Sequence, residues 1–223
     1  MAGKANHDIS SGLDTAFINS AINSNLAYRP EFVSNDYTQG KKVSVAIERE
    51  LRHCDAFYIS VAFITEGGLA PLKQVLAELR DKGIPGKILT TSYLTFTEPK
   101  ALKTLADLSN VEVRVYDSTD EGATGFHTKG YVFKAEEIYR FIVGSSNMTS
   151  SAFSVNKEWN TKLVSTSDGE LLKQMMTEFD ALWNSEHTYA VEDFIEDYEV
   201  RYKLIKEQKK NAAKEQTVDL QAY

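Results

Sequence analysis

The apolar positions of the chain recur with two different periods, and their alternation predicts an α/β protein. Short runs rich in β-branched and aromatic residues, which are typical of buried strands, lie at 57–63, 86–91 and 111–117. Between them, apolar residues recur at helical spacing over 69–83 and 98–108. Strands that alternate with helices in this way form βαβ units, in which a parallel sheet carries helices on its faces.

The rhythm changes after residue 118, where further strands follow with little helix between them. They are expected at 125–133, 139–145 and 160–166, and residues 135–137 are expected to turn a hairpin between the first two. A hairpin adds antiparallel strands to a sheet. The pattern therefore predicts a mixed, largely parallel sheet that is flanked by helices on both faces.

Amphipathic stretches at both ends predict further helices around this core. They lie at 9–26, 42–53, 168–186 and 190–216. The last stretch becomes steadily more charged along its length, which is typical of a solvated arm or of a connection to another domain. We therefore expect an N-terminal helix and loop at 1–41, a main domain at 42–190, and a charged C-terminal helix or linker at 191–223.

The composition limits the class of protein. With 223 residues, 42% of them hydrophobic, the chain is long enough for one sizeable core. No apolar run approaches the roughly 20 residues that span a bilayer. The residues after Lys4 lack the apolar core of a secretory signal, so we expect a cytoplasmic protein. The single cysteine, Cys54, excludes an internal disulfide and a Cys-rich zinc site, and we expect it to be buried.

The formal net charge of -7 constrains any role with nucleic acid. Proteins that only coat nucleic acid are usually basic, because neutralising phosphates supplies most of their affinity. If nucleic acid is the substrate, the positive charge must be local, or another domain must add affinity.

Two clusters of polar residues carry candidate chemistry, and the first is the pair His127 and Lys129. Period two on a strand places these two side chains on the same face. Two cationic groups side by side repel each other and resist burial, but they suit an anion. Lysine supplies a positive charge for a phosphoryl oxygen, and histidine can act as nucleophile or general acid near neutral pH.

The second cluster follows the apolar strand at 139–145. Gly144 permits a close backbone approach, while Ser145 and Asn147 offer uncharged hydrogen-bond groups for the non-bridging oxygens of a phosphate. Further along, Glu158 stands at the start of the next strand. A carboxylate there can hold one nitrogen of a histidine and leave the other ready to attack.

These spacings resemble the phospholipase D superfamily, whose signature is His-x-Lys, a carboxylate and a trailing Gly-Ser-x-Asn. Residues 127–129 and 144–147 match the two parts of that signature. Many members carry an aspartate five residues after the lysine, a position that Lys134 occupies here. The branch that resembles metal-independent restriction nucleases uses a glutamate beyond the asparagine instead. The resemblance therefore transfers the carboxylate role to Glu158.

The resemblance also implies a mechanism and an active unit. Two such motifs meet in this superfamily: one histidine attacks phosphorus and forms a phosphohistidine, and the other protonates the leaving oxygen. Because this chain carries one motif, the implied active unit is a homodimer with His127 of both subunits in one site. No cofactor or metal is implied, since paired Lys129 and Asn147 side chains compensate the charge of the phosphate. The spacing of His and carboxylate residues suggests no metal cluster either.

Several segments are similar to the phospholipase D-like domain at the N-terminus of certain bacterial superfamily 2 (DEAD/DEAH-type) helicases. They are SVAFIT, TSYLTFTEPKAL, GFHTKGYVF, GSSNMT and EWNTK. This similarity implies a nuclease attached to a helicase, with DNA favoured over RNA as substrate. The polar C-terminal segment would then lead towards the helicase core.

Alternatives to the nuclease hypothesis stay open. The same fold can bind nucleic acid without turnover and regulate or dimerise an attached helicase. A lipid phosphodiesterase is less favoured, because no amphipathic Lys/Arg-rich membrane segment is evident. Tyr93 and Phe96 follow the strand at 86–91, where α/β proteins place ligand-binding loops. Base stacking is one interpretation of these two rings, and core packing is the favoured one.

Overall fold

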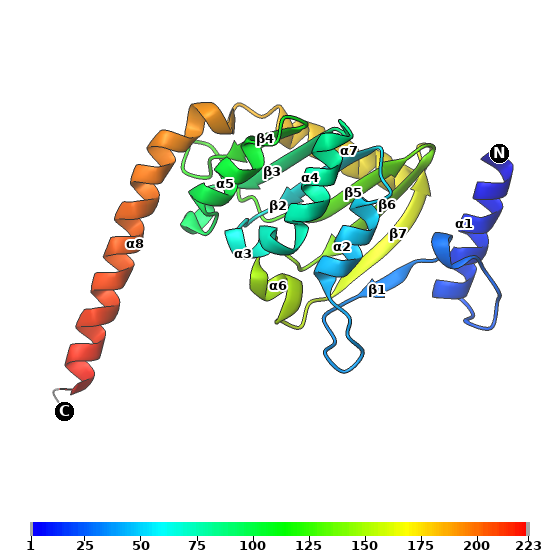
Figure 1. Ribbon diagram of the computed structural model, residues 1–223, viewed down its shortest axis with the longest axis horizontal. Coiled ribbons are helices and arrows are strands. Elements are labelled where there is room, and N and C mark those ends of the chain that lie inside the picture. The colour runs from blue at the N-terminus through cyan, green and yellow to red at the C-terminus, as the bar shows by residue number, and fades with distance from the viewer. Residues whose placement is uncertain (1, 222–223) are drawn as a thin grey trace.

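The computed structural model describes residues 2–221 of the chain. Its centre is one eight-stranded sheet (Figure 1). Side chains are described for residues 3–212, and the parts of the expected terminal segments at residues 1, 222 and 223 lie outside the described residues. The sheet order is β1-β7-β6-β5-β2-β3-β4-β8. The strands are β1 (Glu31–Val33), β2 (Ala56–Val61), β3 (Gly86–Thr91), β4 (Val111–Tyr116), β5 (Lys129–Ala135), β6 (Ile138–Gly144), β7 (Asn160–Thr166) and β8 (Thr188–Ala190).

The predicted α/β fold with a mixed sheet is confirmed, but its parallel part is limited to β2, β3 and β4. The five other strand pairings are antiparallel, which corrects the expectation that the sheet is largely parallel. The predicted β5–β6 hairpin supplies one of these antiparallel pairings. The strand β5 also lies antiparallel against β2, and β7 and β1 continue the antiparallel order outwards.

Helices flank this sheet on both faces, as predicted (Figure 1). They are α1 (Ala2–Phe17), α2 (Val43–Leu51), α3 (Glu66–Leu69), α4 (Lys73–Asp81), α5 (Pro99–Ala106), α6 (Ser150–Ser154), α7 (Glu170–Trp183) and α8 (Val191–Gln221), with 3-10 turns η1 (Leu26–Tyr28), η2 (Ala70–Leu72) and η3 (Tyr93–Thr95). The helices α2, α4, α5 and the start of α8 pack on one face, and α7 packs on the other. None of the helices within residues 2–221 has the length and apolar character needed to cross a membrane.

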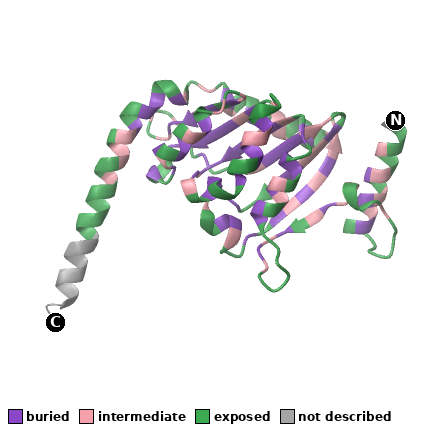
Figure 2. Cartoon of the chain, in the orientation of Figure 1, coloured by how far each residue is buried: buried purple, intermediate pink, exposed green. Residues whose placement is uncertain are grey.

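The alternation of side chains along β5 divides the core between the two faces. Tyr131 and Phe133 pack on the side of α2, while Val132 packs with Leu172 of α7. Tyr131 is 1% exposed and Val132 is 6% exposed, so the strand is buried on both sides. Figure 2 shows that buried residues concentrate in the strands at the centre of the sheet. Burying side chains of this size contributes roughly 1.5–3 kcal/mol each, and this fixes the register of β5.

The N-terminal helix differs from its prediction. It begins at Ala2 and ends at Phe17, so the helix expected over 9–26 is wrong in its second half. The chain turns back after the helix because the Thr15 hydroxyl donates a hydrogen bond to the Ile22 carbonyl oxygen (2.8 Å). Hydrophobic spacing alone does not reveal such a side-chain contact.

Other differences arise from elements too short to show a period. The strands β1 and β8 have three residues each and α6 has five, and none of them is predicted by the apolar pattern. The helix expected over 69–83 divides into α3, η2 and α4 around Pro71. Proline lacks the N–H group that a continuous helix needs at this point.

Gly144 is the last residue of β6 and lies opposite Asn160, the first residue of β7. A Cβ atom at this position would lie 2.2 Å from the carbonyl oxygen of Trp159 and 2.6 Å from the Cα of Asn160. Both contacts are with backbone, which cannot move aside as a flexible side chain can. The close approach expected of Gly144 is thus an approach to the neighbouring strand.

Replacing Gly144 with alanine is expected to destabilise the protein by roughly 1–3 kcal/mol, because β6 and β7 must separate to admit the methyl group. The midpoint of urea unfolding, followed by circular dichroism, measures this change. Gly130→Ala in the neighbouring strand β5 is the matched control, since a Cβ there meets no atom within 4 Å. Equal midpoints for the two variants would contradict the role assigned to Gly144.

Candidate active site

The residues with candidate chemistry meet at the edge of the sheet where β2, β3 and β6 end and β5 and β7 begin. They meet because β5 and β7 run antiparallel to their neighbours. Backbone pairing continues past the strands, as the Ala62 amide donates to the Thr128 carbonyl oxygen (3.0 Å) and the Met148 amide to that of Phe63 (3.0 Å). Ligands of α/β proteins bind at such carboxyl edges, so the sheet places these residues where a substrate has access.

His127 and Lys129 lie side by side, as their spacing predicts. The strand β5 begins at Lys129, so His127 belongs to the segment just before the strand rather than to the strand itself. The Nζ atom of Lys129 lies 2.9 Å from Nδ1 and 3.3 Å from Nε2 of His127. An ammonium this close to both ring nitrogens stands over the face of the imidazole, so the in-plane direction of each nitrogen, along which a lone pair would point, stays open to a ligand. A neutral imidazole is the form that attacks an electrophile.

Ser145 and Glu158 are joined directly. The Ser145 hydroxyl donates to one carboxylate oxygen of Glu158 and accepts from the backbone N–H of Trp159, at 3.1 Å. The other carboxylate oxygen accepts from the side-chain amide of Asn156, at 3.4 Å. Glu158 is only 8% exposed, so its hydrogen bonds are made away from bulk water and hold Ser145 in a defined orientation.

The contacts of Glu158 differ from the histidine contact that the sequence suggests. The strand β6 lies between β5 and β7, so Glu158 stands one strand away from the segment that carries His127. Its described hydrogen bonds go to Ser145 and Asn156, and its charge acts on Lys129. Within one chain, Glu158 therefore orients Ser145 and supports the positive charge of Lys129.

Burial lowers the pKa of Lys129 from its ordinary value, and the nearby charge of Glu158 opposes part of that decrease. For Tyr131, burial raises the pKa well above its ordinary value, and Glu158 raises it further. The Tyr131 hydroxyl therefore stays protonated and donates to the carbonyl oxygen of Ser146 (3.0 Å). This bond fixes the backbone between the two phosphate-binding candidates, Ser145 and Asn147.

Asn147 is oriented by a backbone group of the neighbouring segment. The N–H of Phe63 donates to the Oδ1 atom of Asn147 (3.1 Å), and the Nδ2 group is therefore the one left to donate to a ligand. The preceding residue, Ser146, is buried and anchored by Asn160, whose Nδ2 donates to the Ser146 hydroxyl (2.9 Å). Both bonds restrict the turn that carries Asn147.

Three residues that support the site are not predicted from the sequence, namely Phe63, Tyr131 and Asn160. The first two lie in apolar runs and look like ordinary core residues. A signal was present for Asn160, because an amide at the start of a buried strand needs a hydrogen-bond partner. It is 2% exposed and donates to the carbonyl oxygen of Val33 in β1 as well as to Ser146.

Lys134 lies away from this site. It stands five residues after Lys129 along β5, which is roughly 17 Å at the rise of a strand. Its ammonium lies over the ring of Tyr139, 6.0 Å from the centroid. The lysine at this position therefore adds no charge to the site.

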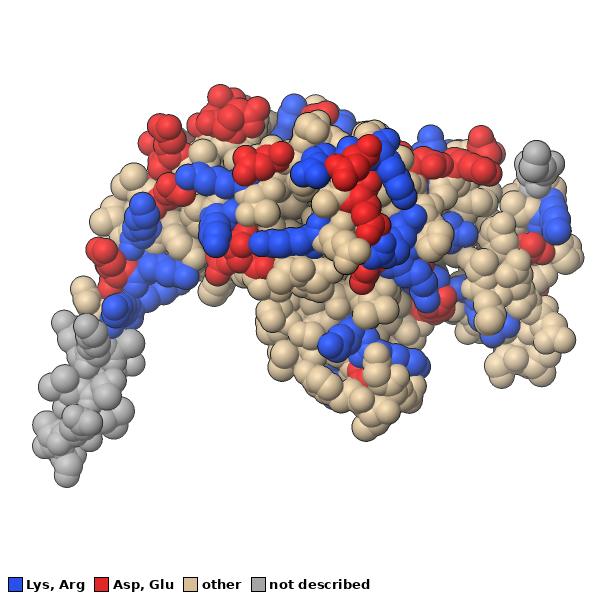
Figure 3. Space-filling view, viewed as in Figure 1, with Lys and Arg blue, Asp and Glu red and all other residues tan. Residues whose placement is uncertain are grey.

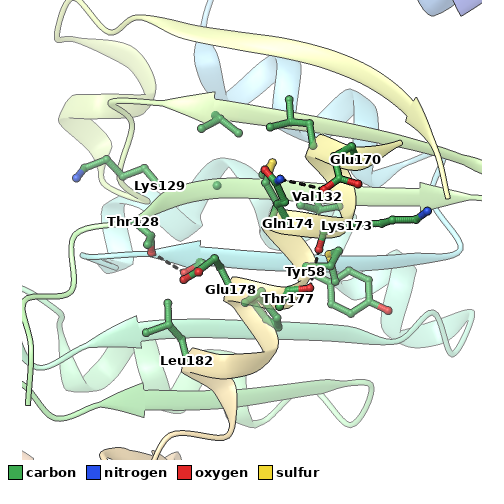
Figure 4. Close-up of a pocket in the computed structure, with 17 residues that line it drawn as sticks. Tyr58, Thr128, Lys129, Val132, Glu170, Lys173, Gln174, Thr177, Glu178 and Leu182 are labelled. Atoms are coloured by element: carbon green, nitrogen blue, oxygen red, sulfur yellow. Dashed lines mark hydrogen bonds between the residues drawn. The ribbon is translucent and has the colours of Figure 1, made fainter. Parts of the chain in front are cut away.

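Two hollows open beside the site. A groove of about 800 Å³ runs between α7 and the strands β2, β5 and β6, and Thr128 and Lys129 lie at one end of it (Figure 4). A second hollow of about 680 Å³ is lined by Asn147 and Glu158 together with the ring of Phe96. Lys129 thus borders a largely apolar groove, and Asn147 borders a hollow with aromatic rings in its wall.

The remaining candidate groups are not placed for chemistry. Cys54 is buried, as predicted, and burial raises the pKa of its thiol to about 11, so it is no ready nucleophile. Within the described part of the chain, no group of three or more His, Cys, Asp or Glu side chains is placed to hold a metal ion.

Comparison with known proteins gives a family and several similar folds. The family model described as "Cardiolipin synthase, PLD-like domain" matches residues 53–183. Nuc from Salmonella typhimurium, a phospholipase D family member, is 15% identical, with a TM-score of 0.54 over 73% of this chain and 98% of that chain. NucT from Helicobacter pylori is also 15% identical, with a TM-score of 0.55 over the same shares of the two chains.

A third similar structure is phosphatidylserine synthase from Haemophilus influenzae, at 14% identity and a TM-score of 0.53 over 85% of this chain and 46% of that chain. No curated protein matches the sequence. At these identities the solved structures establish the fold alone. The family model covers more than half of the chain and includes all five candidate residues, His127, Lys129, Ser145, Asn147 and Glu158. The chain therefore belongs to the PLD-like domain family of the phospholipase D superfamily.

Proposed function

We propose that this protein is a metal-independent phosphodiesterase that acts as a nuclease. The observation that supports the proposal is the meeting of an imidazole with ammonium, hydroxyl and amide groups at one edge of the sheet. His127 supplies the nucleophile. Lys129, Ser145 and Asn147 suit the non-bridging oxygens of a phosphate, where negative charge grows in a five-coordinate transition state. This charge compensation does the electrostatic work that a metal ion does in other phosphodiesterases.

The proposed reaction consists of two displacements at phosphorus. An unprotonated nitrogen of His127 forms a bond to phosphorus, and the bond to the leaving oxygen breaks as that oxygen takes a proton from the partner subunit's His127. A water molecule then gives a proton to the partner's His127 and attacks phosphorus, which releases the first histidine. Lys129 and Asn147 bind the non-bridging oxygens in both steps.

The active unit in this proposal is a homodimer, because the reaction needs two imidazoles and each chain supplies one motif. Attachment to a helicase is a further part of the proposal, supported by the sequence segments in and around the site that resemble helicase-linked domains. A helicase would add nucleic-acid affinity to a chain whose net charge is -7. DNA is the favoured substrate.

The groove beside Lys129 favours one other substrate class. Its wall includes Leu171, Met175 and Leu182 of α7, which suit an acyl chain, while Lys129 would bind the phosphodiester of a lipid. The other alternative is a domain that binds nucleic acid or dimerises a helicase without turnover. The replacement of an aspartate by Lys134 favours that alternative.

Cleavage is expected to persist in EDTA and to require His127. The protein is incubated with single- and double-stranded DNA and RNA, and in parallel with phospholipid vesicles, all in excess EDTA. His127→Ala should lower the rate of nucleic-acid cleavage by roughly 1000-fold or more, because the nucleophile is lost. His53→Ala is the matched control, since that exposed imidazole follows α2 at the opposite edge of the sheet.

Each other outcome of this assay points to a different conclusion. Equal cleavage by His127→Ala and the intact protein would contradict the assigned nucleophile. Nucleic-acid binding without cleavage by the intact protein would favour the binding module. Release of a lipid headgroup with intact nucleic acid would favour the lipid phosphodiesterase.

The charge of Glu158 is expected to raise the alkaline limit of activity. Lys129 must be protonated to bind phosphate; burial lowers its pKa, and Glu158 raises it. Glu158→Gln removes the raising influence, so the alkaline limb of the pH profile of kcat/KM should move to lower pH. Ser145→Ala keeps the charge, and it should lower the rate while the limb stays in place. An unmoved limb in Glu158→Gln would show that its charge does not act on Lys129.

Dimerisation is expected to be necessary for cleavage. One chain has a mass of 25.0 kDa, so sedimentation should show an active species of about twice that mass. When intact protein is mixed and re-equilibrated with His127→Ala, activity should fall as the square of the intact fraction, because mixed dimers lack one imidazole. A strict monomer with full activity, or a linear decrease, would rule out the shared site.

A further inference from the structure

Exposed apolar side chains gather in the turn that follows β3. The turn consists of residues 93–96, and we refer to it as the aromatic turn. Tyr93 is 42% exposed, Leu94 is 52% exposed and Phe96 is 48% exposed. The expectation that the two rings pack in the core is therefore wrong. A cluster of exposed apolar side chains beside a candidate active site is a candidate contact surface for a ligand.

The backbone of the aromatic turn is strained and firmly anchored. Leu94 and Thr95 both have positive φ angles, of 52° and 54°, which side chains with a Cβ rarely adopt. Immediately after the turn, the hydroxyl of buried Tyr198 in α8 donates to the carbonyl oxygen of Thr97 (2.8 Å). Strain that surrounding contacts hold in place is typical of ligand sites.

A series of rings connects the aromatic turn to the nucleophile. The ring of Phe96 lies edge-to-face against Phe63, with 4.9 Å between centroids, and Phe63 lies 6.0 Å from the ring of His127. Phe63 and Phe96 also line the hollow that contains Asn147. A group that rests on Phe96 is therefore adjacent to a phosphate held by His127 and Asn147.

The helix α8 brings positive charge to the same place. Residues 191–200 hold five acidic residues and no basic one, whereas residues 201–212 hold five basic residues and a single acidic one, Glu207. Figure 3 shows these opposite charges along the two parts of the helix. From the basic part, Lys209 places its Nζ atom 5.1 Å from the centroid of Phe96 and 3.4 Å from the carbonyl oxygen of Leu94.

We propose that Phe96 and Lys209 form a binding strip for single-stranded nucleic acid beside the cleavage site. An unpaired base stacks on Phe96, and Lys209 binds the phosphate next to that base. The exposed contact between Lys209 and the ring is weak, so the ammonium can exchange it for a phosphate. This inference rests on the proposed function, because it takes the phosphodiester to belong to nucleic acid.

The chemistry of the strip selects a single strand over a duplex. Bases in a duplex are stacked on each other and present only their edges, whereas an unpaired base offers its face to a ring. A lysine adds affinity through the backbone of either form. The ring therefore confers the preference for a single strand, and the lysine adds affinity without sequence preference.

Binding is measured by fluorescence anisotropy with a labelled oligothymidylate of about 12 nucleotides, a length that spans one binding groove, and with a duplex of the same length. All proteins carry His127→Ala and are kept in EDTA, so the probe stays intact. Phe96→Ala is expected to weaken single-strand binding about tenfold, and Phe96→Trp is expected to restore it. Lys209→Ala is expected to weaken it about threefold and to make the salt dependence shallower by about 0.7 in slope.

The controls are Phe17→Ala at the end of α1, which removes a ring that is 65% exposed, and Lys82→Ala, which removes an equal charge. Lys82 follows α4 and precedes β3, so it lies at the opposite edge of the sheet from the aromatic turn. Selective loss in the Phe96 and Lys209 variants supports the strip, even if the intact protein fails to cleave. Unchanged binding in both variants overturns it, even if cleavage by the intact protein establishes the nuclease. Equal loss of single-strand and duplex binding in Phe96→Ala also overturns it.

Discussion

The antiparallel pairing of β5 with β2 is the constraint on which the rest of the structure depends. It places Val61 opposite Lys129 at one end and Ala56 opposite Lys134 at the other. A slip by one residue would exchange the buried Tyr131 and Val132 between the two faces of the sheet, and both cores would be lost. The same register carries the imidazole and the ammonium to the edge where the polar turn after β6 arrives. Packing in the interior therefore fixes the position of groups that act on the surface.

The site also explains how a chain with a net charge of -7 could act on the anionic substrate proposed for it. Net charge describes the field at long range, whereas a phosphodiester at the site interacts with groups a few ångströms away. There, the chain offers Lys129 and the amide of Asn147, and the acidic residues at the start of α8 are followed by a basic half. The positive charge near the site therefore comes from Lys129 and the basic half of α8, and the acidic remainder of the chain disfavours unspecific binding elsewhere.

The order of elements and the chemistry of the site follow from the sequence to different extents. Strands such as 86–91 are long and strongly apolar, so their periodicity predicts them directly. The pair His127 and Lys129 is local, so strand spacing is enough to predict their proximity. The contact of Ser145 with Glu158 and the orientation of Asn147 by Phe63 depend on which strands become neighbours. Sequence spacing does not contain that information. For the same reason, it does not predict that Phe96 is exposed.

The buried Glu158, whose charge acts on Lys129, has a consequence for how the proposed nuclease would release its product. A lone ammonium in a half-buried site would attract any phosphate, whether it is a substrate, a product or the inorganic ion. Because the charge of Glu158 acts on Lys129, a doubly charged phosphomonoester end would meet repulsion from Glu158 as well as attraction from Lys129. The attraction of Lys129 would be strongest in the transition state, where negative charge grows on the phosphoryl oxygens. In the proposed reaction, this repulsion favours departure of the cut end over a tightly held product complex.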